Sequence, residues 1–306
     1  MADFPPLIVL LGPTASGKSA LAMAVAQRVG AELLSVDSMQ VYRAMNIGTA
    51  KPLAEEQARV RHHLIDVVEP DAEFTVAQFV ERADAVIADA KAAGRPLIAT
   101  GGTPLYYKAL FEGLFDGPAA DPAVRAKLAE SSPEALHARL SAVDPAAATR
   151  IHVNDGRRLL RALEVFEITG RPISDHQRQW DAPHRHAAVW FGLQWDKDVL
   201  NRRINARVKQ MLAGGWVEET RSLIGRYGDL SRTAGEATGY QELIQHVRGR
   251  LSLEEATEQI KIGTRQLARR QTKWFRRWPQ VHWLPGDGSV EAHADAILNR
   301  CRADTA

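Results

Sequence analysis

The first third of the chain alternates short apolar runs with amphipathic segments. Residues 7–11 are all apolar and end in a Gly-rich turn, which is the pattern of a strand buried on both faces of a parallel sheet. Residues 19–29 then carry apolar side chains at helical spacing. The same patterns predict further strands at residues 32–36, 63–68 and 96–100, and a helix at residues 74–93. This order predicts a three-layer α/β fold with a parallel sheet.

Strand patterns disappear in the middle of the chain, and helical patterns replace them. Asp121-Pro122 marks a helix start, and Asn154-Asp155 precedes a second predicted helix at residues 157–169. A strand pattern returns at residues 187–194, and amphipathic helices then continue almost to the end, broken at glycine-containing segments 214–215, 225–228 and 235–239. We therefore predict an α/β core, residues 1–118 and 188–306, interrupted by an all-helical insertion domain at residues 119–187.

The composition is that of a water-soluble globular protein. Of the 306 residues 45% are hydrophobic and 25% are charged. The N-terminal residues lack the basic start of a secretory signal, and the first apolar run is too short to cross a bilayer, so we expect a cytoplasmic protein with no membrane partner. Residues 1–120 carry a net charge of −4 and residues 121–306 a net charge of +6. We therefore expect a polyanionic partner to bind the second part.

A phosphate-binding loop follows the first predicted strand. Residues 12–19, Gly-Pro-Thr-Ala-Ser-Gly-Lys-Ser, match the full GxxxxGK[ST] pattern and open the first predicted helix, as the motif requires. Backbone N–H groups, the helix dipole and the charge of Lys18 favour an anion there, and Ser19 is placed to ligate Mg²⁺. The sequence thus predicts a P-loop NTPase-like core whose phosphate-binding residues are Gly12, Pro13, Thr14, Ala15, Ser16, Gly17, Lys18 and Ser19.

The loop alone does not identify the phosphorylated compound. Most loops of this kind bind ATP or GTP, so a small-molecule kinase stays open, as does an RNA-binding module without turnover. A magnesium-binding aspartate at a strand end is expected beside such a loop. Both Asp37 and Asp66 follow predicted strand segments, and the pattern does not choose between them.

A strongly basic segment lies near the C-terminus. Residues 261–277 carry seven basic residues and no acidic one. Projected as a helix, most of the basic residues fill one arc, and the other arc holds Leu267, Ala268, Gln271, Trp274, Phe275 and Trp278. We expect the second arc to dock on the protein and the first to face a polyanion, the alternative being an ordinary solvated face.

Several further motifs follow the P-loop in order and carry a family resemblance. They are Ser-Val-Asp-Ser-Met-Gln-Val-Tyr at residues 35–42, Gly-Thr-Ala-Lys-Pro at 48–52, Gly-Gly-Thr-Pro-Leu-Tyr at 101–106, Asp-Pro-Ala-Val-Arg at 121–125, Arg-Leu-Leu-Arg-Ala-Leu-Glu at 158–164 and Thr-Arg-Gln-Leu-Ala-Arg-Arg-Gln at 264–271. Together they resemble the tRNA dimethylallyltransferases along nearly the whole chain. The resemblance implies transfer of a dimethylallyl group from dimethylallyl diphosphate to N6 of the adenosine just 3′ of the anticodon, with Mg²⁺ as cofactor. It also implies that the partner is the anticodon stem-loop of tRNA, and we expect a monomer.

The resemblance also assigns roles to residues. It implies that Asp37 is the general base, and that Thr14, Lys18 and Ser19 stabilise the leaving diphosphate. The downstream arginine that helps to hold the diphosphate is left open, with Arg221 and Arg226 as candidates. The residues that match tRNA-contacting stretches of the family are Asp37, Ser38, Met39, Gln40, Thr103, Arg125, Arg157, Arg158, Leu159, Leu160, Arg161, Glu236, Ala237, Thr238, Gly239, Tyr240, Gln241, Arg269, Arg270, Gln271, Thr272, Lys273, Trp274, Phe275 and Arg276.

Two points qualify these assignments. The arginines of the predicted insertion could instead be helix-surface residues paired with Glu164 and similar neighbours. Thr238 stands where the family usually has an apolar residue before Gly239-Tyr240, so this chain departs from the family pattern at that position.

Overall fold

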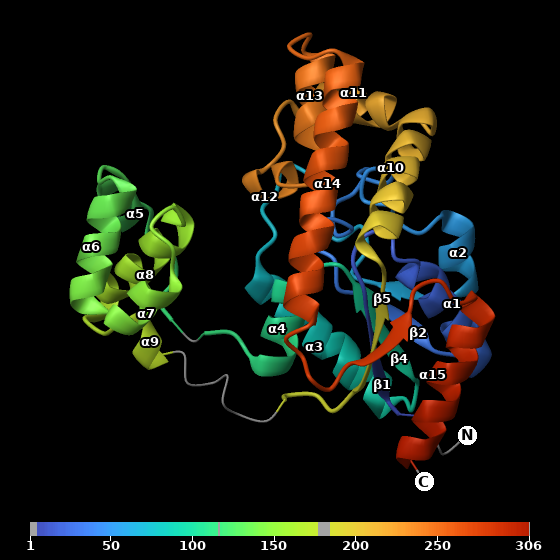
Figure 1. Ribbon diagram of the computed structural model, residues 1–306. Helices are drawn as coiled ribbons and strands as arrows, with labels where there is room; N and C mark the ends of the chain where they lie inside the picture. The colour runs from blue at the N-terminus through green and yellow to red at the C-terminus, as the bar shows by residue number, and fades with distance from the viewer. Residues whose placement is uncertain (1–4, 116, 177–183, 306) are drawn as a thin grey trace. The chain divides into compact units, whose positions relative to one another are not determined.

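The chain divides into two compact units (Figure 1). The computed structural model describes residues 5–115, 117–176 and 184–305. The core unit comprises residues 1–110 and 186–306, and the helical unit comprises residues 111–185. The helical unit therefore begins earlier in the chain than the insertion predicted from sequence at residues 119–187.

The core unit is built on a six-stranded sheet in the order β3-β2-β4-β1-β5-β6, with every adjacent pair parallel. This confirms the predicted α/β class. The strands are β1 Leu7–Leu11, β2 Glu32–Ser35, β3 His62–His63, β4 Leu97–Gly101, β5 Val189–Gln194 and β6 His282–Pro285.

Helices cover both faces of this sheet (Figure 1). Ile8 and Leu10 of β1 share one apolar cluster with α1 and α15, while the intervening Val9 points to the opposite face. Because both faces are covered, β1 is apolar at every position. The helices packed around the sheet are α1 Lys18–Val29, α3 Val76–Ala92, α4 Pro104–Glu112 and α15 Val290–Thr305, and the short helix α2 Ala54–Arg59 has no buried residue.

A group of C-terminal helices extends from one end of the sheet (Figure 1). The long helix α14 packs against α10 and α13, and α11 packs against α13. A capping box between Ser252 and Glu255 starts α14. No helix in the described part of the chain is long and apolar enough to cross a membrane. These elements are α10 Lys197–Ala213, α11 Trp216–Tyr227, α12 Arg232–Gly235, α13 Tyr240–Val247 and α14 Leu253–Phe275.

The helical unit has its own apolar core. Leu128, Leu140 and Leu163 belong to one buried cluster that five short helices share. Asp121 accepts hydrogen bonds from Ala123 N and Val124 N, which confirms the predicted helix start. The helices are α5 Pro122–Ala129, α6 Pro133–Val143, α7 Pro145–Arg150, α8 Gly156–Thr169 and α9 Ile173–His176.

Two sequence-based predictions about strands were wrong. The strand predicted at residues 63–68 ends at His63, because Leu64 and Asp66 adopt left-handed backbone angles, with φ of 61° and 54°. The strand β6 was missed because it is only four residues long and lies between two helices. It extends the sheet by pairing in parallel with β5.

Candidate active site

The P-loop borders a cavity of about 480 Å³ at the carboxyl edge of the sheet. The predicted β1 and α1 flank the loop, which confirms the context that the motif requires. Loops that follow β2 and β4 form other walls, and α10 and α14 close the cavity. Ligands of open parallel sheets bind at this edge, because the loops after neighbouring strands converge there.

The P-loop conformation depends on close packing within the loop and on its neighbours. A Cβ at Gly12 would lie 2.6 Å from Ser16 Oγ and 3.3 Å from Ser16 Cβ, so a larger residue here would force Ser16 to move. Gly17, with φ of 95°, caps the start of α1. Trp195 Nε1 donates to Ser16 O at 2.9 Å, and Arg203 Nε donates to Ala15 O at 2.9 Å. Both contacts use carbonyl oxygens, so they fix the loop without using its N–H groups.

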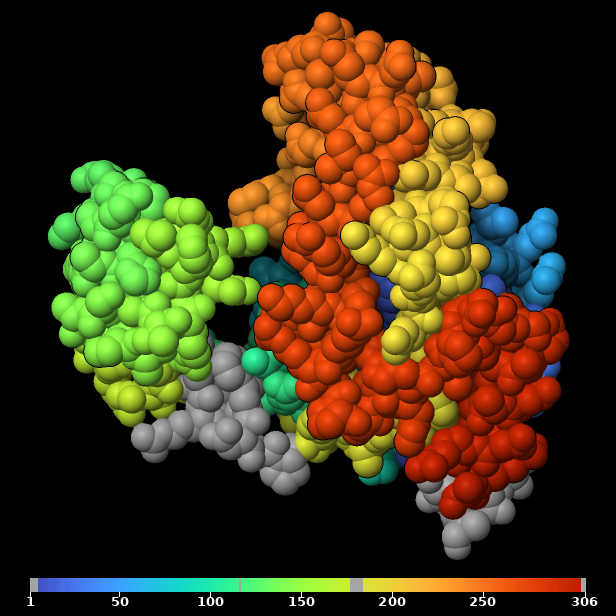
Figure 2. All heavy atoms as spheres, viewed as in Figure 1, coloured from blue at the N-terminus to red at the C-terminus, as the bar shows by residue number. Residues whose placement is uncertain are grey.

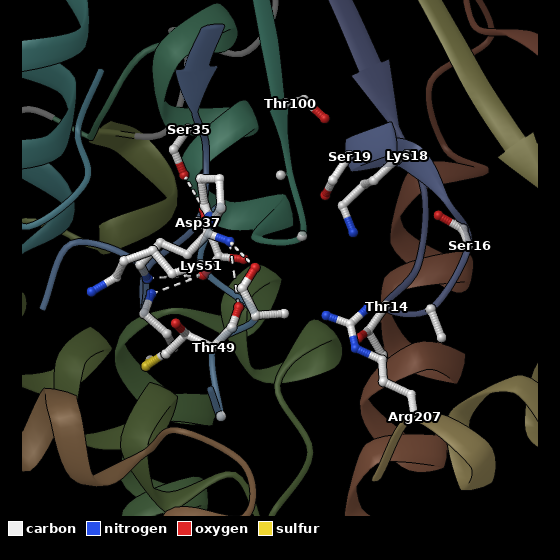
Figure 3. A pocket seen from close by; sticks show the side chains of 18 of the residues that line it. Thr14, Ser16, Lys18, Ser19, Ser35, Asp37, Thr49, Lys51, Thr100 and Arg207 are labelled. Carbon is white, nitrogen blue, oxygen red and sulfur yellow. Dashed lines mark hydrogen bonds between the residues drawn. The ribbon is translucent and has the colours of Figure 1, made fainter. Parts of the chain in front are cut away.

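Two cations meet inside the cavity. Figure 3 shows Lys18 and Arg207 on one side, facing Asp37 on the other. Burial, and to a lesser extent the neighbouring charge of Arg207, lower the pKa of Lys18 to about 8, although Asp37 opposes both effects. Burial also lowers the pKa of Arg207, opposed by Asp37. Lys18 and Arg207 are two partly buried cations side by side, and an anion such as diphosphate would neutralise them.

Arg207 is the cavity arginine that sequence reasoning missed. Of the two candidates offered, Arg221 pairs with Glu218 at 3.8 Å, and Arg226 lies over the ring of Tyr227. Neither arginine lines the cavity, so neither lies beside the P-loop as Arg207 does. A signal was present in the sequence, because Arg203 and Arg207 are four residues apart and thus share one face of a helix.

Asp37 is held in place by the turn that it begins. Its Oδ1 accepts hydrogen bonds from Met39 N at 2.9 Å and from Gln40 N at 3.4 Å. Among the described residues none donates a hydrogen bond to Oδ2. Asp66, the other aspartate considered, forms an ion pair at 2.6 Å with Lys51 and does not line the P-loop cavity. The structure therefore selects Asp37 as the carboxylate that faces the P-loop.

Ser38, Met39 and Gln40 also line the cavity, but Gln40 has a framework role. Its side-chain Oε1 accepts a hydrogen bond from Ser35 Oγ at 2.8 Å. Its Nε2 donates to the carbonyl oxygens of residues 49 and 50, at 3.3 and 3.2 Å. The amide of Gln40 thus ties the loop after β2 to the Gly-Thr-Ala-Lys-Pro segment.

The basic segment forms the last part of α14 and docks as predicted. Ala268, Phe275 and Trp278 are buried. A cleft of about 1280 Å³ borders the basic side between α10 and α14, two helices that Figure 2 shows adjacent on one face. Four exposed residues of this segment form no ion pair with any described residue, namely Arg269, Arg270, Lys273 and Arg276. The charge arrangement suits a polyanion.

The insertion arginines are partly engaged within the helical unit. Arg125 binds Glu164 through two hydrogen bonds of 2.9 and 3.0 Å, and Arg161 binds it through one of 2.6 Å. Burial acts to raise the pKa of Glu164, but the hydrogen bonds from both arginines outweigh it, so the pKa is lowered. Arg158 forms an ion pair with Asp155, with 3.3 Å between Nη1 and Oδ2. The alternative of structural pairing with Glu164 is thus confirmed for Arg125 and Arg161.

The structure buries some side chains that the sequence assigned to tRNA contact. The buried ones are Leu159, Ala237, Tyr240, Gln271 and Phe275. These side chains therefore offer little exposed surface to tRNA. Glu236, Ala237 and Thr238 line the P-loop cavity. Thr272 Oγ1 donates to Ala268 O at 2.9 Å, and Gln241 Nε2 donates to Gly235 O at 3.1 Å.

The fold and the cavity define the class of this protein as a P-loop α/β protein with a carboxylate opposite its phosphate-binding loop. Residues 40–278 match the family model described as IPP transferase. The chain belongs to this family, the tRNA dimethylallyltransferases.

Individual relatives and solved structures support this family assignment. The tRNA dimethylallyltransferase of Geobacter metallireducens is 45% identical, with 95% of this chain and 96% of the relative covered. That of Symbiobacterium thermophilum is 50% identical, with 91% and 89% covered. The crystal structure of tRNA delta(2)-isopentenylpyrophosphate transferase from Staphylococcus epidermidis is 35% identical and matches with a TM-score of 0.72, covering 97% of this chain and 99% of that one. A eukaryotic dimethylallyltransferase acting on tRNA is 26% identical and matches with a TM-score of 0.83, covering 99% and 81%.

Proposed function

We propose that this protein transfers the dimethylallyl group of dimethylallyl diphosphate to N6 of adenosine 37 in the anticodon stem-loop of tRNA, in the cytoplasm. The observation that carries the proposal is the shared cavity, in which Asp37 faces Lys18 and Arg207. In the reaction the bond between C1 of the dimethylallyl group and the diphosphate oxygen breaks. A bond from N6 to C1 forms, and N6 loses one proton.

The P-loop side of the cavity would stabilise the leaving group. Negative charge grows on the diphosphate oxygens as the bond to C1 breaks. The ammonium of Lys18, the guanidinium of Arg207 and the hydroxyl of Thr14 all line the space where those oxygens would lie. Charged and polar groups already oriented before the reaction stabilise such charge without the cost of reorganising solvent.

Asp37 would act on the nucleophile. The lone pair of N6 is delocalised into the purine, so a carboxylate that accepts the N6 proton assists formation of the new bond. The turn fixes Asp37 through Oδ1, as described above, and Oδ2 is the oxygen available to N6. Ser38 and Met39 would line the base pocket beside it.

The target base must leave the anticodon stack to reach this cavity, at a cost of about a few kcal/mol. Exposed cations on α14 are suited to hold the phosphates of the flanking nucleotides. The helical unit would contribute Arg157, Arg158 and the exposed parts of Arg125 and Arg161 to the stem-loop. We propose that both units bind the same tRNA and that the monomer suffices.

Magnesium would enter with the diphosphate. Mg²⁺ prefers oxygen ligands and is often bound by one or two protein groups together with phosphate oxygens and waters. Ser19 presents its hydroxyl on the cavity side of the P-loop (Figure 3). This hydroxyl, together with diphosphate oxygens and waters, would fit a magnesium ion, whose chemistry when bound would be to neutralise charge on the leaving oxygens.

The test is transfer of radiolabel from dimethylallyl diphosphate to tRNA in the presence of magnesium. Label should appear at adenosine 37 with the native protein. With Asp37→Asn, kcat should fall at least about a hundredfold while the Kd for tRNA changes less than about twofold. Asp71→Asn, at an exposed loop aspartate, is the matched control and should behave as the native protein. ATP-dependent phosphoryl transfer without label in tRNA would instead support the kinase alternative.

A further inference from the structure

Gln271 occupies an unusual place on α14. It lies on the arc of the helix that docks on the protein, and its side chain is buried, with 4% exposed. Its Oε1 accepts a hydrogen bond from Thr14 N at 2.9 Å, and its Nε2 donates to Gly102 O at 2.6 Å. One side chain of the basic helix therefore binds the P-loop and the loop after β4 at the same time.

We propose that Gln271 is a positioning residue that sets the distance between the diphosphate-binding loop and the carboxylate of Asp37. The proposal rests on the function proposed above and assigns Gln271 to the alignment of the two substrates. It removes the Gln271 side chain from the set of tRNA contacts that the family resemblance implies.

The order of the strands shows why such a bridge is needed. The P-loop follows β1 and Asp37 follows β2, but β4 lies between these two strands in the sheet. Their loops can therefore be aligned through the loop after β4. Gln271 joins the P-loop to Gly102, and the next residue, Thr103, accepts a hydrogen bond from Ser38 N at 2.9 Å.

The resulting chain of contacts ends beside the carboxylate. Ser38 directly follows Asp37, and Thr103 Oγ1 also donates to Ser38 Oγ at 3.2 Å. The loop after β4 approaches so closely that a Cβ at Gly102 would lie 2.6 Å from Gln271 Nε2 and 3.7 Å from Asp37 Oδ2. The spacing across the three loops is thus determined by hydrogen bonds and close packing together.

The chemistry of the amide matches the two loops. Thr14 N–H needs an acceptor and Gly102 C=O needs a donor, and a glutamine amide supplies both from one planar group. A glutamate anion keeps the acceptor, loses the donor and adds negative charge beside the diphosphate site. A protonated glutamic acid again offers both an acceptor and a donor. Methionine has a similar length and offers neither a strong acceptor nor a donor.

The experiment compares Gln271→Met and Gln271→Glu with the native protein and with Gln259→Met, a control at an exposed glutamine on the same helix. Both Gln271 variants should lower kcat about tenfold to a hundredfold, because small displacements of reacting groups have effects of that size. The Kd for tRNA should change less than about twofold. For Gln271→Glu, kcat relative to that of the native protein should recover as the pH falls and the carboxyl becomes protonated. A role that depended only on side-chain size would not produce this recovery.

Binding of inorganic diphosphate is measured by calorimetry on the same proteins, because this measurement does not depend on the transfer reaction. Gln271→Met should weaken it several-fold. If Gln271→Met does not fold, Gly102→Ala is tested in its place, because the added Cβ displaces the same amide from the other side. Gly102→Ala should lower kcat and diphosphate affinity to the same extent. The inference is overturned if a folded Gln271 variant keeps native kcat and native diphosphate affinity. It is also overturned if the variant loses only affinity for tRNA. A native protein that binds diphosphate but transfers no label would refute the proposed function separately.

Discussion

Raising the pH should weaken the binding of dimethylallyl diphosphate, because Lys18 loses its proton. Burial and the charge of Arg207, opposed by Asp37, together lower the pKa of Lys18 from its ordinary value of 10.5 to about 8. The bound diphosphate favours the ammonium form, so the complex keeps a proton that the free protein begins to lose. Affinity is therefore fully present below this pKa and is lost as the pH rises through about 8.

The size of the effect follows from the titration of one group. With a pKa of about 8, Lys18 in the free protein is about nine-tenths protonated at about pH 7 and about one-tenth protonated at about pH 9. If the ammonium form binds, the apparent Kd rises about tenfold between these two pH values. The terminal phosphate of the ligand ionises near about pH 6, so its own charge is nearly constant over this window.

Isothermal titration calorimetry provides the assay. The Kd is measured across this pH range, and at about pH 8 the titration is repeated in buffers of different ionisation enthalpy. Binding there should take up about half a proton. Lys18→Arg is the control, because arginine stays charged throughout and should give a nearly flat profile. A flat profile for the native protein, or the same slope in Lys18→Arg, would refute the reasoning.

Three further predictions concern other charged groups. Arg207→Ala should raise the KM for dimethylallyl diphosphate about tenfold to a hundredfold in steady-state assays, whereas Arg221→Ala, outside the cavity, should leave it unchanged. Glu164→Ala should destabilise the helical unit by about 1–3 kcal/mol, since it removes a buried carboxylate that accepts hydrogen bonds from Asp121 N and two arginines, and hydrogen exchange across residues 111–185 should speed up accordingly. In the native protein the contribution of Glu164 should be present above its ordinary pKa of 4.5 and lost as the pH falls through its lowered pKa in the folded protein; exchange that is insensitive to acid would contradict this. Changing Arg269 and Arg276 to glutamate together should reduce the slope of log Kd for tRNA against log salt by about two, and an unchanged slope would show that this face does not bind phosphates.

Features that depend on contiguous residues were predictable from the sequence. The P-loop is a single run of residues between a strand and a helix, and the structure shows it in that context. The docking side of the basic helix followed from its periodicity, because burial on a helix repeats every 3.6 residues. The same projection placed Gln271 on the buried arc, although its partners could not be deduced, since they lie on loops from distant parts of the chain.

Features that depend on tertiary contacts were harder to predict. Arg207 reaches the P-loop only because α10 packs over the carboxyl edge of the sheet. The choice between Asp37 and Asp66 required the turn at Leu64, whose left-handed backbone diverts the chain and directs Asp66 toward Lys51. Residue type alone also could not show whether Arg125 faces solvent or binds a buried carboxylate.

The most direct test of the central claim is a crystal structure with a thiolo analogue of dimethylallyl diphosphate, whose sulfur at the scissile position prevents reaction. We predict that the diphosphate lies in the P-loop, within hydrogen-bonding distance of Lys18 and Arg207, and that C1 of the isoprenoid faces Asp37. Diphosphate bound outside this loop, or a dimethylallyl carbon directed away from Asp37, would contradict the account.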